Sequence, residues 1–218
     1  MIMAGVPMQD KSVDFWSRIA DDYESGIDDI IGQRSRMYMF NKMLELEEPG
    51  NVIELGCGTG FFTRAIAKNA GHVVATDISD DMLERAKENL WDLKNVEFRK
   101  MDCENIPFPD NTFDTVLMAN ILQIVHDPKK ALHESYRILR PGGALIILFY
   151  THYGLSVFEK FQFWTKMIKK FKGKPPYQRM LDPEEVLKMA EEAGFRVEVL
   201  ELVGEKFKAV YLKGKKTI

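Results

Sequence analysis

The stretch that decides the fold is Glu54-Leu55-Gly56-Cys57-Gly58-Thr59-Gly60. It lies between a short apolar run at residues 51–55 and a helical pattern over residues 61–69. Glycines let the backbone turn tightly and approach a ligand without interference from a Cβ atom. The helix that follows presents free N–H groups at its first turn. The stretch therefore predicts a ligand-binding loop between a strand and a helix.

Strand and helix patterns continue to alternate after this loop. Helices are expected at residues 80–89, with Ser79 or Asp80 as N-cap, and at residues 128–139. Pro141-Gly142-Gly143 predicts a turn before the fifth strand. Strands that alternate with helices need crossover connections, so the sheet should be mainly parallel with helices on both faces. The five expected strands are residues 51–55, 72–76, 96–100, 113–119 and 144–149.

The pattern changes toward the C-terminus. A helix capped at Asp182 should end at Gly194, and strand-like runs follow at residues 196–202 and 207–212. The short loop at Gly204 favours an antiparallel hairpin. We therefore expect an α/β fold: a doubly wound, mostly parallel seven-stranded sheet with a C-terminal antiparallel hairpin. A length of 218 residues favours a single domain over residues 1–218. An N-terminal helical cover (about 12–48) and a lid insertion (about 151–181) should belong to it.

The composition excludes several classes of protein. Hydrophobic residues make up 45% of the chain and charged residues 29%, values typical of a globular protein and not of a disordered one. The net charge of −3 provides no global positive field for nucleic acid. Cys57 and Cys103 are too few for a disulfide framework or a four-ligand zinc site, and the histidines lack metal-ligand spacing. No apolar run approaches the ~20 residues that span a bilayer, so we expect a cytoplasmic protein.

Asp77 is the acidic partner of the glycine loop. It ends the second expected strand, twenty-one residues after Gly56. At this distance a doubly wound fold places a carboxylate against ribose hydroxyls, although an Asp here also suits a helix cap. Phe61 stands where a dinucleotide fingerprint has its third glycine, which disfavours NAD. Loop and carboxylate together predict a ligand that contains a nucleoside.

The chain resembles the class I S-adenosylmethionine-dependent methyltransferases, in particular the branch of ubiquinone- and menaquinone-biosynthesis C-methyltransferases. Four blocks carry the resemblance: Glu54 to Gly60; Thr76-Asp77-Ile78-Ser79 with Met82-Leu83 and Ala86; Asp102 with Phe108-Pro109-Asp110-Asn111-Thr112-Phe113-Asp114; and Leu139-Arg140-Pro141-Gly142-Gly143. The resemblance implies S-adenosylmethionine as cofactor and S-adenosylhomocysteine as its product.

The resemblance also implies a role for each matching residue. Glu54 and the backbones of Gly56 and Gly58 would hold the methionine end, and Asp77 the ribose. Ile78 and Met82 would flank the adenine, whose polar edge would meet Asp102 and the N–H of Cys103. The Asn120 carbonyl would accept from the methionine ammonium, Tyr23 would cover the cofactor, and Arg34 or Arg36 would pair with its carboxylate. The expected cofactor site is Tyr23, Arg34, Glu54, Gly56, Cys57, Gly58, Gly60, Asp77, Ile78, Met82, Asp102, Cys103 and Asn120.

Two charged segments flank this core. Residues 1–32 are rich in acids and residues 158–179 in bases. Helical spacing places six apolar side chains of the second segment on one stripe, which suits a lid, ordinary core or a membrane surface. We expect a lid whose apolar face turns inward, and membrane contact as the least favoured of the three. The stripe consists of Val157, Phe158, Phe161, Trp164, Ile168 and Phe171.

The predicted function is direct methyl transfer from S-adenosylmethionine to a small, hydrophobic or aromatic acceptor. Ala119-Asn120-Ile121-Leu122 replaces the Asn/Asp-Pro-Pro-Tyr motif of amine-methylating relatives, which disfavours exocyclic amines. No catalytic residue is assigned and no metal is expected. The alternatives are a non-catalytic S-adenosylmethionine-binding protein and, less favoured, an NAD-dependent oxidoreductase. The expected partner is the small-molecule acceptor, without nucleic acid or membrane contact, on a monomer or homodimer.

Overall fold

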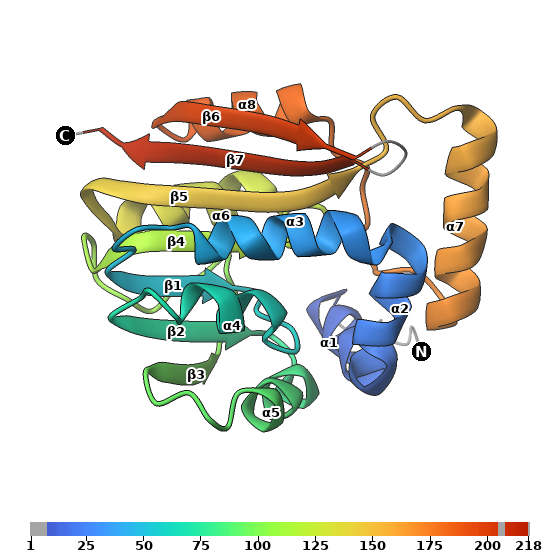
Figure 1. Ribbon diagram of the computed structural model, residues 1–218, viewed down its shortest axis with the longest axis horizontal. Helices are drawn as coiled ribbons and strands as arrows, with labels where there is room; N and C mark the ends of the chain where they lie inside the picture. Colours follow the sequence, from blue (N-terminus) through green and yellow to red (C-terminus); the bar gives the residue numbers. More distant parts are fainter. Residues whose placement is uncertain (1–7, 205–207, 218) are drawn as a thin grey trace, which may run out of the picture.

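A computed structural model describes residues 8–204 and 208–217. Its centre is a seven-stranded sheet in the order β3-β2-β1-β4-β5-β7-β6 (Figure 1). β7 runs antiparallel to β5 and β6, and the other neighbours are parallel. The doubly wound sheet with its terminal hairpin is therefore confirmed. The strands are β1 Asn51–Leu55, β2 His72–Asp77, β3 Val96–Lys100, β4 Phe113–Ala119, β5 Leu139–Thr151, β6 Phe195–Val203 and β7 Lys208–Lys216.

Helices cover both faces of the sheet. On one face α3 (Gln33–Leu44) and α4 (Phe61–Ile66) bury Met39, Met43 and Ile66 against the strands. On the other face α6 (Pro128–Ile138) and α8 (Pro183–Glu192) bury Leu132 and Val186. α5 (Asp80–Asn89) has the predicted bounds, and the Ser79 hydroxyl caps it by accepting from the Met82 N–H at 3.3 Å. Capping and burial of one apolar face account for each helix.

The segment around Pro141 corrects one prediction. It does not separate a helix from a strand, because β5 begins at Leu139 and runs through the glycines. Phe113 pairs with Leu139, and the next pair joins Thr115 to Ala144, so β5 carries extra residues in a bulge. Gly142 has a φ of +79°, a value that glycine adopts without strain. The predicted turn is therefore replaced by an irregularity inside the strand.

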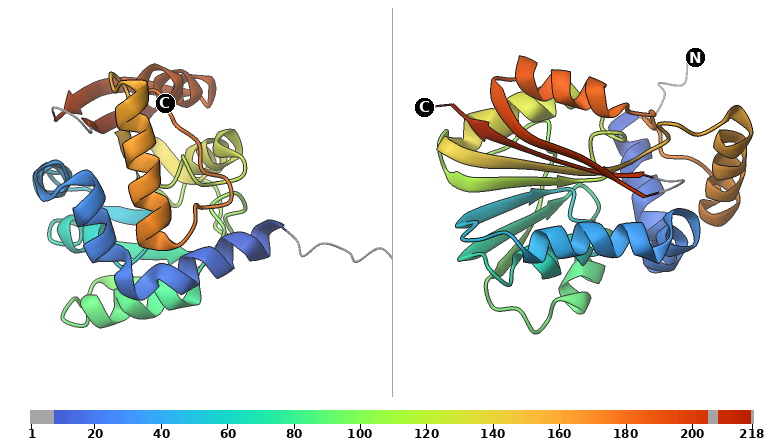
Figure 2. Two further views of the ribbon diagram at one scale, coloured as in Figure 1. Left: turned by 90° about the vertical axis from the view of Figure 1, so that its right-hand side faces the viewer. Right: turned by 45° about the horizontal axis from the view of Figure 1, so that its top comes forward.

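A helical cover lies beyond the carboxyl ends of the parallel strands (Figures 1 and 2). It consists of α1 (Met8–Ile19), the short 3₁₀ helix η1 (Ala20–Asp22), α2 (Tyr23–Ile31) and α7 (Val157–Phe171). Phe15 and Ile19 of α1 and Ile30 of α2 share a small apolar cluster with α7 and with Met82 of α5. This cluster joins two segments that are far apart in sequence.

The predicted stripe on α7 is wrong in its orientation. The α7 side chains buried in the cover are Phe163, Met167 and Phe171, of which only Phe171 belongs to the predicted stripe. Apolar residues extend over more than half of the helix circumference, so their spacing did not reveal which part would face the protein. The rest of the stripe includes the outward side chains Val157, Phe158, Phe161 and Ile168, which are 85%, 67%, 65% and 49% exposed.

Glu24 connects the cover to the glycine loop. Its carboxylate accepts a hydrogen bond from the Thr59 hydroxyl and forms an ion pair with Arg36. Arg36 is only 4% exposed, donates to Asp28 at 2.8 Å, and lies over the ring of Phe61 at 3.7 Å. Because α2, α3 and the glycine loop meet at this one carboxylate, Glu24 should control how often the cover opens.

We therefore predict that Glu24→Gln loosens the cover. The substitution weakens a charge-assisted hydrogen bond to a buried guanidinium, a change worth ~1–3 kcal/mol. Amide exchange in residues 23–31 should accelerate about fivefold or more, while exchange in β5 stays unchanged. Asp21→Asn is the matched control, since it removes an exposed pair with Arg85 from the same cover. Equal exchange in the two variants would contradict this role of Glu24.

Candidate functional site

A cleft of about 450 Å³ opens between the carboxyl ends of the parallel strands and the cover. This is where doubly wound sheets bind their ligands. The lining includes nine of the thirteen residues expected from the sequence, which are Tyr23, Gly56, Gly58, Asp77, Ile78, Met82, Asp102, Cys103 and Asn120.

The glycine loop has a geometry that only glycines provide. Gly56 has a φ of +73°, and a Cβ atom there would lie 2.5 Å from Cδ1 of Ile121. Gly60 has a φ of +86°, and a Cβ atom there would lie 2.6 Å from Cδ1 of Leu90. At Gly58, a Cβ atom would lie 3.8 Å from the ring of Tyr23, so this cover residue lies above the loop. The backbone is thus exposed to the cleft, with the Tyr23 ring over it.

The Asp77 carboxylate fixes the glycine loop by accepting hydrogen bonds from the backbone. One carboxylate oxygen accepts the N–H of Gly58 at 2.9 Å, and the other accepts the N–H of Ser79 at 3.0 Å. Burial raises the pKa of Asp77, and these backbone hydrogen bonds act in the opposite direction. Each oxygen has two lone pairs, so Asp77 retains acceptor capacity toward the cleft it lines. Two neighbouring hydroxyls of a ribose fit this capacity.

Ile78 and Met82 line the cleft beside Asp77, together with Asp102 and Cys103 from the turn after β3. The two apolar side chains suit the faces of an adenine ring. The Asp102 carboxylate and the Cys103 N–H suit its polar edge. Burial raises the pKa of the Cys57 and Cys103 thiols, which keeps both protonated. A packed thiol, rather than a nucleophile, is therefore the role that fits Cys57.

Asn120 has a backbone conformation that is unusual for a residue other than glycine. Its φ is +56°, and its N–H donates to the carbonyl of Leu148 at 2.7 Å. The Oδ1 atom is buried and has no hydrogen-bond partner in the parts of the chain that the structure describes. Strained backbone and an unsatisfied buried oxygen at the end of a strand are typical of a binding site.

The other four expected residues lie outside the cleft lining. Glu54 is 1% exposed and accepts from the Thr63 hydroxyl at 2.5 Å, and Cys57 and Gly60 shape the loop from within. The exposed Arg34 is a correction, because it lies on the solvent side of α3, away from the cleft. Its alternative, Arg36, is already engaged by Glu24 and Asp28. Neither arginine reaches the cleft.

A second, smaller cavity of about 70 Å³ adjoins the cleft under α7. The two share Trp16, Tyr23, Asn120 and Ile124 in their linings. The walls of the inner cavity are mostly apolar and include Phe15, Ile27, Phe163, Met167 and Phe171.

Polar side chains also line this inner cavity, among them Gln123, Tyr150 and His152. The Gln123 Oε1 and the Tyr150 hydroxyl are buried without a hydrogen-bond partner among the described residues. Burial lowers the pKa of His152 to about 4, and the positive charge of Lys160 contributes a smaller part of this shift. The His152 imidazole is therefore neutral at pH 7. Sequence analysis missed all three, because they come from two distant segments and belong to no motif. The signal in the sequence was the position of these polar residues close to the carboxyl ends of β4 and β5.

The described residues contain no group of three or more His, Cys, Asp or Glu side chains placed to hold a metal ion. Within the same residues, no helix is long and apolar enough to cross a membrane. The expectation that no metal is required stays a prediction.

The fold and the cleft define a class I methyltransferase domain, with a glycine loop after β1 and a carboxylate at the end of β2. A family model described as a methyltransferase domain matches residues 53–147. Ubiquinone/menaquinone biosynthesis C-methyltransferase UbiE of Ectopseudomonas mendocina is 35% identical over 159 residues, which cover 69% of this chain and 62% of that protein. The chain belongs to the class I S-adenosylmethionine-dependent methyltransferases and resembles UbiE.

Further comparisons agree on the family. UbiE of an Enterobacter species is 41% identical over 103 residues, covering 44% of this chain and 41% of that protein. The crystal structure of an S-adenosylmethionine-dependent methyltransferase from Aquifex aeolicus matches with a TM-score of 0.62 and 28% identity, covering 86% of this chain and 92% of that one. The chain spans between about two fifths and three fifths of the length of the curated relatives it matches first.

We predict that Asp77→Ala weakens the binding of S-adenosylhomocysteine. The ribose hydroxyls would lose their acceptor, at a cost of ~1–3 kcal/mol, or about a fivefold to 150-fold loss of affinity by calorimetry. Asp92→Ala, which removes an exposed carboxylate paired with Arg64, should bind as wild type does. Equal affinity of the two variants would remove Asp77 from the site.

Glu54 generates a pH prediction. Burial and the nearby Asp77 raise its pKa from 4.5 to about 8, against the Thr63 hydrogen bond. The folded state therefore holds a proton that the unfolded state releases above pH 4.5, and stability should fall as the pH rises toward 8. Glu54→Gln should flatten this decline and exceed wild type above pH 8 by on the order of 1 kcal/mol in urea unfolding. A parallel decline in both proteins would show that Glu54 ionises normally.

Proposed function

We propose that the chain transfers the methyl group of S-adenosylmethionine to a small, hydrophobic or aromatic acceptor held where the inner cavity opens into the larger cleft. The observation that carries this proposal is the junction of the two cavities at Trp16, Tyr23 and Asn120. A ligand in the larger cleft and one in the inner cavity would meet there, as a direct transfer requires. We keep the cytoplasm as the proposed location of the reaction.

The larger cleft supplies the contacts for the cofactor. Asp77 would accept from the ribose hydroxyls, and Ile78 and Met82 would pack against the adenine. Gly58 and Asn120 would hold the methionine end. When bound, the cofactor supplies a methyl group already activated by the sulfonium. The chain then has to align the acceptor with this methyl group and exclude water, and alignment alone contributes up to ~7–11 kcal/mol.

The cover provides the dry surroundings. Tyr23 stacks with Phe171 at 6.2 Å between ring centres, and Trp16 meets Tyr23 edge-on at 6.2 Å. Trp16 and Tyr23 line both cavities, and α1, α2 and α7, which carry the three rings, lie beyond the ends of the parallel strands (Figure 2). Exclusion of water favours transfer to the acceptor over loss of the methyl group to solvent.

The inner cavity indicates the character of the acceptor. Aromatic and aliphatic walls favour a ring or other apolar body, and the Gln123 Oε1 and Tyr150 hydroxyl suit one polar substituent such as a hydroxyl. Burial raises the pKa of Tyr150, so its hydroxyl stays protonated and can donate. The names of the relatives, which refer to ubiquinone and menaquinone biosynthesis, support an acceptor of the quinol type.

Methyl transfer is tested with S-adenosylmethionine carrying a tritiated methyl group and a prenylated naphthohydroquinone as the acceptor probe. Tyr150→Phe should raise the KM for the acceptor about tenfold, the cost of one buried hydrogen bond, and leave S-adenosylhomocysteine affinity unchanged. Tyr153→Phe is the matched control, since Tyr153 is 48% exposed and lies outside the cavity. EDTA should leave the rate unchanged.

Two results would contradict the proposal. Tight binding of S-adenosylhomocysteine without label transfer to this acceptor or to any component of a lipid and metabolite extract would favour a non-catalytic binding protein. Activity lost with EDTA and restored with magnesium would show that a metal orients the acceptor.

A further inference from the structure

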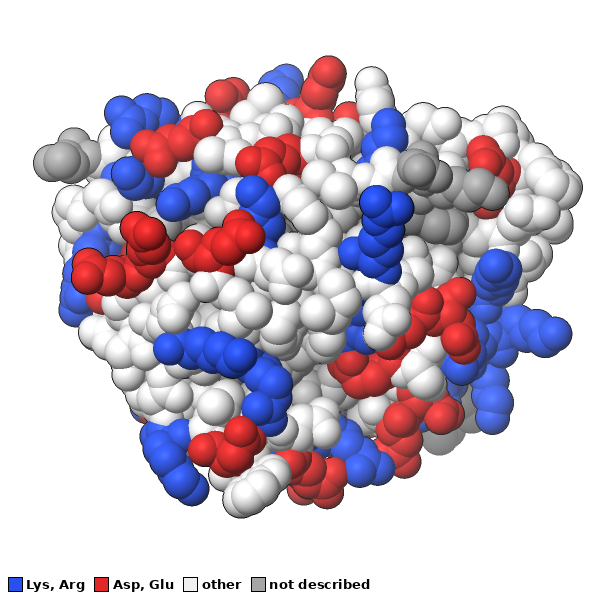
Figure 3. All heavy atoms as spheres, viewed as in Figure 1, with Lys and Arg blue, Asp and Glu red and all other residues white. Residues whose placement is uncertain are grey.

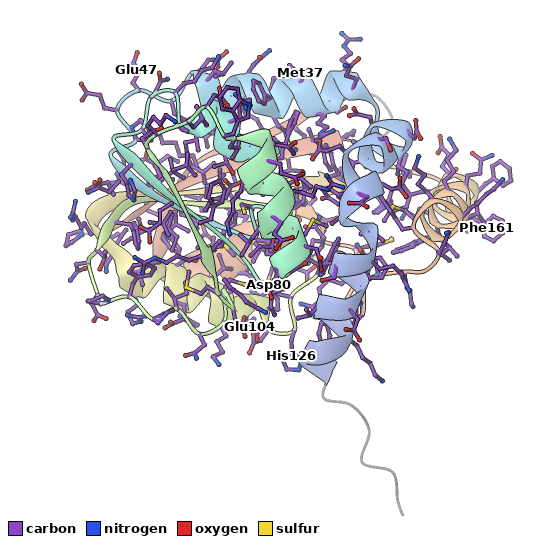
Figure 4. The ribbon with its side chains drawn as sticks, turned by 90° about the horizontal axis from the view of Figure 1, so that it is seen from below. Met37, Glu47, Asp80, Glu104, His126 and Phe161 are labelled. Atoms are coloured by element: carbon purple, nitrogen blue, oxygen red, sulfur yellow. The ribbon has the colours of Figure 1, made fainter. Side chains whose placement is uncertain are left out.

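The outer face of α7 is an apolar surface that no described residue covers. Val157, Phe161 and Ile168 recur at helical spacing along one line, and Phe158 lies beside them. In Figure 4, Phe161 projects from α7 away from the rest of the molecule. Tyr153, just before the helix, is exposed as well. Large side chains in this number on one exposed face are a mark of an interaction site.

Basic side chains accompany this face. Lys166, Lys169, Lys172 and Lys174 are exposed, and none forms an ion pair with a residue that the structure describes. Lys170 differs, because it pairs with Asp29 at 2.9 Å. Figure 3 shows blue side chains gathered beside the lower half of α7, and mostly uncharged atoms along its upper half. The surface is locally basic although the chain carries a net charge of −3.

We propose that the outer face of α7 docks on an anionic lipid bilayer. A helix with an apolar stripe and lysines beside it lies in the plane of a membrane interface, with its aromatic side chains among the lipids and its lysines at the phosphates. From sequence, membrane contact was the least favoured role for this helix. The structure changes this ranking, because it separates an inner apolar face of α7, which packs in the cover, from an outer apolar face, which does not.

A bilayer fits this face better than a second copy of the chain does. Four acids of the cover are already paired: Asp21 with Arg85, Glu24 and Asp28 with Arg36, and Asp29 with Lys170. A two-fold contact between two α7 helices would bring unpaired lysines together, which costs energy. An anionic bilayer supplies negative charge to these lysines without this repulsion.

The two faces of α7 also place the inner cavity close to such a surface. Phe163 and Met167 line that cavity, while Phe161 and Ile168 of the same helix point outward. A docked α7 would therefore separate the lipid from the cavity by the thickness of one helix.

Flotation with vesicles tests the proposal without an identified substrate. Wild type should float with vesicles of equal parts phosphatidylglycerol and phosphatidylcholine, bind pure phosphatidylcholine much less, and be released as ionic strength rises. Phe158→Glu with Phe161→Glu should lower partitioning at least about tenfold. Lys169→Glu with Lys172→Glu should lower it about tenfold.

Matched variants elsewhere control for general effects. Trp91→Glu replaces an aromatic side chain that is 77% exposed after α5, and Lys68→Glu reverses an exposed lysine after α4. Both should float as wild type does. All α7 variants should keep the wild-type melting temperature and affinity for S-adenosylhomocysteine, because the replaced side chains point to solvent. These readouts separate a failure of docking from a failure of the proposed function.

Several outcomes would overturn the proposal. One is wild type that does not float, and another is equal binding to neutral and anionic vesicles. Undiminished flotation of the phenylalanine variant would place any membrane contact elsewhere. A wild-type dimer in light scattering that the phenylalanine variant dissociates would assign the face to a second copy.

Discussion

The carboxylate of Asp77, held between the N–H groups of Gly58 and Ser79, connects the parts of this molecule that matter for binding. It joins the end of β2 to the glycine loop after β1 and to the first turn of α5. A buried carboxylate is costly, and two backbone donors reduce that cost while fixing its orientation. The loop backbone then stays open to the cleft, because Gly56 and Gly60 leave no side chain in its path.

The cover depends on the same loop. Glu24 reaches it through Thr59, and Tyr23 lies over Gly58, so α2 is positioned by the element that shapes the cleft. The junction of the two cavities follows from this arrangement. Asn120 lies at that junction with a strained backbone, and its orientation is fixed by the hydrogen bond to Leu148. The positions of the loop, the cover and the acceptor cavity are thus linked.

Local signals in the sequence were enough for the sheet and for most of the cleft. Periodicity located β1 to β4, the cap at Ser79 located α5, and the spacing from Gly56 to Asp77 identified two residues that line the cleft. Contacts between distant segments were not predictable. Gln123 and Tyr150 come together only in the folded chain, Arg34 shares a helix with the buried Arg36, and α7 is apolar over too wide an arc to reveal its inner face.

A crystal structure of the chain with S-adenosylhomocysteine tests the central claim most directly. Both ribose hydroxyls should lie within hydrogen-bonding distance of the Asp77 carboxylate, with the sulfur directed toward the junction at Asn120 and the inner cavity. A ligand bound away from Asp77, or one whose sulfur points away from the inner cavity, would contradict the assignment of this cleft.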